Sequence, residues 1–102
     1  MRIIETLSGM IEDEIKDAEK YAKKALETKA TNRKLADVFF QLSTEEMHHM
    51  NMLHGEVARA IEEYRKTEGD PPPGMLAMYE ILHERHIEDA ATVKILQNMY
   101  LE

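Results

Sequence analysis

The most informative pattern in the sequence lies in residues 41–53, which read QLSTEEMHHMNML. Its composition is typical of a helix, yet two acids and two histidines stand among its apolar residues. An α-helix advances about 100° per residue, so Glu46 and His49 project from one face about 60° apart. This spacing makes the two side chains a candidate pair of metal ligands.

Glu46 and His49 continue a stripe of apolar residues. The stripe is spaced 4, 3, 4, 3, 4 and comprises Leu35, Phe39, Leu42, Glu46, His49 and Leu53. Because this period is typical of a helix face that meets a partner helix, we expect the acid and the imidazole to point inward. The neighbouring pair, Glu45 and His48, lies in line with polar residues and only two apolar ones, so it is predicted to face solvent.

A carboxylate or an imidazolium that is buried without a partner is costly, so such groups are usually neutralised, paired or bound to a metal. The sequence leaves two interpretations of Glu46 and His49. In the first, they bind a metal ion. In the second, they form an internal Glu–His hydrogen bond or polar layer that fixes the register of two helices.

The composition limits the class of protein. The chain has 102 residues, which predicts a single domain, 1–102, and a net charge of −7 without a basic cluster, which argues against nucleic acid as a partner. No apolar run has the length of a signal peptide or a membrane span, so we expect a cytoplasmic protein that does not enter a membrane. Cysteine is absent, so any metal must be held by oxygen and nitrogen.

The chain is predicted to be all-α, because helix-forming residues dominate and no stretch alternates with the period of a strand. The expected helices span about 2–29, 33–66 and 75–100. The first two form an antiparallel hairpin, since only a short connection separates them, and Asn32 or Thr31 can cap the second. Residues 67–74 contain three consecutive prolines and form a stiff linker to the third helix.

The first helix carries a second acid in an apolar stripe. That stripe comprises Ile4, Leu7, Ile11, Glu14, Ala18, Tyr21 and Ala25. Glu14 then faces the hairpin partner, unless the stripe rotates locally and the carboxylate reaches solvent. For Tyr21, a half-buried ring with its hydroxyl at the surface is the ordinary interpretation.

The third helix offers histidines. Residues 86–90 align with residues 14–18 of the first helix, which puts His86 in the position of Glu14 and His83 on the same side. His86 is therefore either an added metal ligand, or a partner of a ligand, or a partly buried histidine at a helix contact.

Taken together, Glu14, the segment 42–49 and Tyr21 resemble the ferritin-like superfamily, in particular rubrerythrin-type and encapsulated-ferritin-type di-iron carboxylate proteins. The resemblance covers about residues 3–60. It implies a four-helix bundle in which two helices each give one Glu and the other two each give Glu-x-x-His. It also implies that Glu14, Glu46 and His49 are the metal-binding and catalytic residues and that Tyr21 lies beside the metal cofactor.

This chain departs from the rubrerythrin pattern, because it has three expected helices and only one Glu-x-x-His. The resemblance then implies that two copies share the site, in a homodimer or a higher homo-oligomer. Hard carboxylates with an imidazole suit iron, with manganese as another candidate, and the implied activity is oxidation of Fe(II) by O₂ or peroxide. Glu14 would bridge or clamp the metals, Glu46 would ligate or bridge, and His49 would bind terminally.

Two other functions remain open from the sequence. Histidines and methionines crowd residues 47–54, which suits a copper-binding protein because thioethers favour Cu(I), although the methionines do not share one face. The other is a metal-free helical interaction module. The metal content of the purified protein separates these possibilities.

Overall fold

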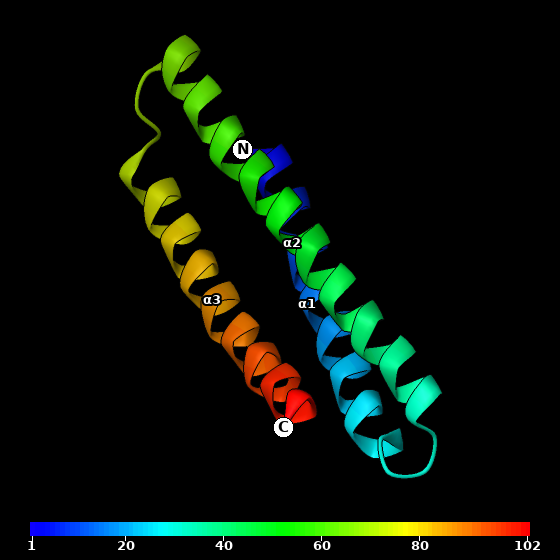
Figure 1. The fold of residues 1–102 in the computed structure, drawn as a ribbon. Coiled ribbons are helices and arrows are strands. Elements are labelled where there is room, and N and C mark those ends of the chain that lie inside the picture. Colours follow the sequence, from blue (N-terminus) through cyan, green and yellow to red (C-terminus); the bar gives the residue numbers. More distant parts are fainter.

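The computed structural model describes all 102 residues, as three helices without a strand. They are α1 (Arg2–Thr28), α2 (Arg33–Glu68) and α3 (Pro73–Leu101). The three run side by side in an elongated bundle of 56 × 18 × 17 Å (Figure 1). The all-α prediction is confirmed. None of the helices is both long enough and apolar enough to cross a membrane.

The helix ends follow local sequence signals. Asn32 caps α2, because its side-chain oxygen accepts a hydrogen bond from the backbone N–H of Leu35 at 3.1 Å. Gly69 ends α2 with a positive φ of 83°, a conformation that glycine adopts without steric cost. Pro73 occupies the first turn of α3, where its missing N–H leaves no helical bond unmade.

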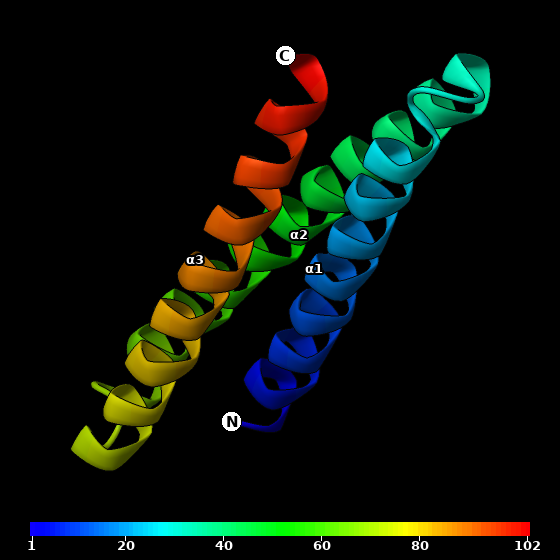
Figure 2. The same ribbon diagram turned by 90° about the horizontal axis from the view of Figure 1, so that it is seen from below.

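The arrangement of the helices is uneven. α1 and α2 form the predicted antiparallel hairpin, and α3 packs mainly on α1 with little contact to α2. The C-terminal part of α2 runs past the N-terminus of the chain and connects to α3 there (Figures 1 and 2). α3 begins eight residues after Arg65 of α2 and lies along the hairpin of its own chain. The stiff linker alone did not require this position.

The core lies between the hairpin and α3. Its central cluster comprises Ile11, Ile15, Ala18, Met50 and Val93, from all three helices. A buried hydroxyl ties the helices together beside this cluster. Ser43 donates a hydrogen bond to the carbonyl oxygen of Ala18 at 2.7 Å and accepts one from the Gln97 amide at 3.0 Å. Small side chains at this crossing let the backbones of α1 and α2 approach closely.

A second cluster holds the C-terminal end of α3. Tyr100 is buried, stacks on Phe40 with ring centroids 4.8 Å apart, and donates a hydrogen bond to the Asp37 carboxylate. The ammonium group of Lys29 donates a hydrogen bond to the Tyr100 carbonyl oxygen at 2.6 Å. These contacts join α3 to both helices of the hairpin near its connecting turn.

The predicted inward stripe of α2 is not its most buried row. The buried residues are Ala36, Ser43 and Met50, whereas Leu35 is 40% exposed and His49 is also exposed. On α1 the prediction is right at four positions, Ile4, Ile11, Ala18 and Ala25, but the other buried residues are Ser8, Ile15 and Ala22. The core of α1 faces both α2 and α3, whereas that of α2 faces mainly α1, with Ser43 also reaching Gln97 of α3. The expected stripes consequently lie along the edge of the core and border the face of the hairpin that α3 does not cover.

Candidate metal-binding triad

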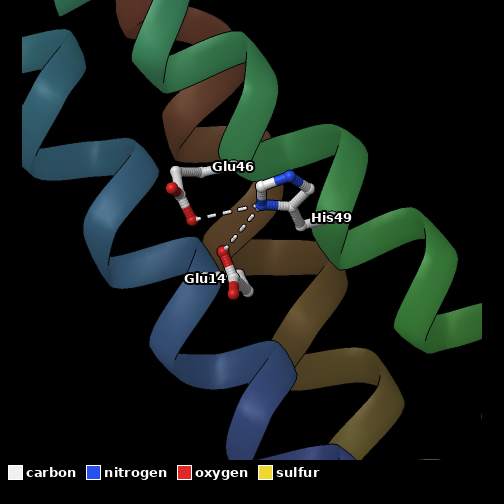
Figure 3. Close-up of side chains that lie close together, drawn as sticks. All are labelled: Glu14, Glu46 and His49. Atoms are coloured by element: carbon white, nitrogen blue, oxygen red, sulfur yellow. Dashed lines mark ion pairs between the residues drawn. The ribbon is translucent and has the colours of Figure 1, made fainter.

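Three potential metal ligands meet on the uncovered side of the hairpin. Glu14 comes from α1, and Glu46 and His49 come from consecutive turns of α2. Figure 3 shows both carboxylates directed at the imidazole, with α3 passing behind the hairpin. One donor atom from each of the three residues lies within 4.8 Å of the others. We call Glu14, Glu46 and His49 the triad.

The distances in the triad suit a shared cation better than hydrogen bonds. His49 Nδ1 is 3.6 Å from Glu14 Oε2 and 3.8 Å from Glu46 Oε2. A hydrogen bond between nitrogen and oxygen has a length of about 2.7–3.2 Å, so neither separation is one. Donor atoms that share one ion at bonds of about 2.0–2.2 Å can lie up to about 4.4 Å apart. Both separations fall within that limit.

Glu14 contains the least satisfied polar atom of the site. Its Oε2 is hidden from solvent and has no hydrogen-bond partner. Burial of a carboxylate oxygen without a partner costs free energy that a bound cation would recover. The alternative in which Glu14 turns away to solvent is therefore wrong for this oxygen, which lies between the two helices.

The triad is only partly enclosed. The side chain of Glu46 is 19% exposed and that of Glu14 is 26% exposed, but that of His49 is 53% exposed. The single chain thus holds the carboxylates from one side and leaves the imidazole open on the other. A cation placed among them would keep vacant coordination positions toward the uncovered face.

The neighbouring pair of acid and histidine lies elsewhere. Glu45 and His48 are both exposed on the outer side of α2, where Glu45 accepts a hydrogen bond from Gln41 at 3.1 Å. The structure therefore brings Glu46 and His49 to Glu14 and leaves Glu45 and His48 in solvent. The two pairs differ by one residue in register, which makes the outer pair a matched control for the inner one.

Two other predicted site residues do not join the triad. Tyr21 is half-buried two turns along α1 from Glu14, and its ring stacks on Phe39 with centroids 6.4 Å apart. No hydrogen bond connects its hydroxyl to the triad. His86 is 6% exposed and lies on α3, among residues of α1 and α2 on the covered side. The alignment of residues 86–90 with 14–18 therefore does not bring His86 to Glu14.

The structure also forms a contact that the sequence did not predict. His54 Nε2 of α2 and His83 Nδ1 of α3 are 2.6 Å apart. The sequence predicts that His83 lies on the same side of the third helix as His86. No local signal relates His54 to them, because this contact depends on how α3 packs along the hairpin.

Comparison with known proteins adds no identification: no protein family, curated protein or solved structure matches the chain. The fold and the triad define an all-helical protein with a candidate metal-binding group on a two-helix hairpin.

Proposed function

We propose that the protein binds iron at the triad and oxidises Fe(II) with O₂ or peroxide, as a ferritin-like di-iron carboxylate protein assembled from two copies. The observation that carries the proposal is the buried, unpartnered Oε2 of Glu14, which lies 3.6 Å from His49 Nδ1. An anionic oxygen in this position needs a cation. The group is formed by residues from two helices, so the fold holds the donors before the ion arrives.

The chemistry of the donors favours iron. Carboxylate oxygens and an imidazole nitrogen are the ligands that iron and manganese share in proteins, whereas copper and zinc more often take softer sets. Two anionic carboxylates also stabilise Fe(III) more than Fe(II), because the attraction grows with the charge of the ion. Glu14 and Glu46 would therefore favour the oxidised product, and exposed His49 would leave room for the oxidant.

A second copy would complete the coordination. Three donors fill only part of an iron coordination sphere, and the triad opens on the uncovered face of the hairpin. Large apolar side chains that are 40–52% exposed are found on the same two helices and include Ile3, Met10, Leu35 and Val38. In a two-fold dimer each copy presents the same surface to the other, so the two hairpins would form a four-helix bundle with six ligands.

The test is anaerobic Fe(II) titration of the purified protein, followed by exposure to O₂ or peroxide. We expect about one iron per chain and a change in the iron spectrum on oxidation. Glu46→Ala/His49→Ala should abolish both, while the outer pair, Glu45→Ala/His48→Ala, should keep them. Equal losses in the two variants would contradict the proposal. Unmodified protein that holds no transition metal and takes up no Fe(II) would instead favour a metal-free interaction module.

A further inference from the structure

A second group of possible metal donors lies between α2 and α3, on the covered side of the hairpin. His54 of α2 is paired with His83 of α3, with ring centroids 4.5 Å apart and planes tilted by 44°. His86 follows His83 after one helical turn. Two adjoining cavities are each lined by all three histidines. We call these three residues the histidine seam.

The seam differs chemically from the triad. No carboxylate lines either cavity, and the other lining residues are mainly apolar, with Met50 among them. Met50 precedes His54 by one turn of α2, so its thioether lies on the same side of the helix. The seam therefore offers nitrogen, with sulfur nearby, where the triad offers mainly anionic oxygen. Nitrogen and sulfur donors suit zinc and copper better than iron or manganese.

The contact between the two rings and the burial of His54 and His86 favour the neutral form of these two imidazoles. A separation of 2.6 Å between two ring nitrogens requires one of them to carry the proton and the other to accept it. Burial lowers the pKa of His54, and the neighbouring His83 lowers it further. Burial also lowers the pKa of His86, although Glu12 of α1 and Asp89 of α3 act in the opposite direction. Neutral imidazole is the ligand that a metal ion needs.

The geometry requires only a small change to admit an ion. Two imidazole nitrogens bound to one tetrahedral ion at about 2.0–2.1 Å lie about 3.3 Å apart. The pair would have to separate by about 0.7 Å from its present 2.6 Å. The ring of His83 is exposed and free to make this movement. Only the triad has three donors within 4.8 Å of one another, so the buried ring of His86 must turn toward the pair to give a third bond.

We propose that His54, His83 and His86 form a second transition-metal site, for zinc or copper, that links α2 to α3 within one chain. This site does not depend on the iron function of the triad or on a second copy. A metal bond between these helices would add a strong connection where the packing is sparse. The metal should consequently stabilise the attachment of α3.

The test uses Glu46→Ala/His49→Ala, in which the triad cannot compete. Calorimetric titration at neutral pH with Zn²⁺, and separately with Cu²⁺, should give about one bound ion per chain for at least one metal, with a raised melting temperature. Adding His83→Ala should weaken this binding by about 100-fold or more. His83 is exposed, so its removal should leave the helical circular dichroism unchanged, and His54→Gln provides a second measurement within α2.

His48→Ala is the control, because His48 is an exposed histidine of α2 outside the seam. It should bind Zn²⁺ or Cu²⁺ as its parent does. Absence of binding for both metals, or binding that His83→Ala and His54→Gln leave unchanged, would overturn the proposal. Neither result would affect the triad, whose iron binding is measured on chains with an intact seam.

Discussion

The two faces of the α1–α2 hairpin are built from neighbouring rows of the same helices, yet one face is buried and the other is exposed. The face toward α3 buries Ile11, Ala18 and Met50, which are at most 8% exposed. The opposite face carries the triad and leaves Met10 and Val38 46% and 51% exposed. The single chain therefore buries one face of the hairpin in its core and leaves the other face exposed. The candidate metal ligands lie on the exposed face.

The largest effect should come from preventing a second copy from covering the open face. Leu35→Lys/Val38→Lys puts two charges on that face, eight or more residues away from Glu46, so the triad itself is retained. We expect a monomer whose Fe(II) affinity is lower by about 100-fold or more, because half of the proposed ligands are lost. Analytical ultracentrifugation, with and without Fe(II), and iron titration measure the two effects.

A matched control places the same charges on the outer side of α3. Ile81→Lys/Ile95→Lys changes two residues that are 59% and 61% exposed. This variant should keep the oligomeric state and the iron affinity of the parent protein. If it dissociates while Leu35→Lys/Val38→Lys does not, the open face of the hairpin is not the interface. A monomer that binds iron with full affinity would also contradict the shared site.

The next effect compares one residue from each face in the monomeric Leu35→Lys/Val38→Lys protein. Ile11→Ala should lower the free energy of unfolding by about 2–5 kcal/mol, because Ile11 is 1% exposed in the central cluster and its loss leaves a cavity. Met10→Ala should change it by no more than about 0.5 kcal/mol in the same background. Chemical denaturation followed by circular dichroism gives both values. Similar losses would mean that the two faces are equally packed.

Much of the fold was predictable because its signals are local. The helix-forming composition, the Asn32 cap and the run of prolines each act within a few residues, and they place the three helices with errors of one or two residues at most ends. It was less predictable which row of residues on each hairpin helix would be buried. A helix that contacts two partners buries two adjacent rows, and the sequence alone does not say which flank a third helix will cover. The actual core of α2 is therefore displaced from Leu35, Leu42 and His49 toward Ala36, Ser43 and Met50.

The sites show the same limit. Glu46 and His49 are one turn apart, so their common face follows from helix geometry, and the short connection made Glu14 of the adjacent helix a reasonable third member. The contact between His54 and His83 depends on how α3 slides along the hairpin, which is decided by packing at residues such as Val93. The position of His86 away from Glu14 has the same cause. An alignment between two helices shows that residues occupy equivalent positions on each helix, but it does not show that these residues have the same neighbours in the fold.

The smallest expected effect concerns the contacts that hold α3 on the covered face. Tyr100 and Arg33 both donate hydrogen bonds to the Asp37 carboxylate, and they lower its pKa, the bond from Tyr100 most strongly. A carboxylate with a depressed pKa stabilises the fold above its ordinary pKa of 3.8, and this contribution disappears as the pH falls below that value.

Asp37→Asn should therefore lower the melting temperature by about 1–4 °C at pH 7, since the group is exposed and screened. The difference from the parent protein should shrink as the pH falls below 3.8 and vanish only below the depressed pKa of Asp37, where both side chains are neutral. Glu62→Gln, which removes one exposed charge without an ion pair, is the control and should show no such pH-dependent difference. A deficit of Asp37→Asn that persists unchanged at pH 3 would show that the loss does not come from the ionised carboxylate.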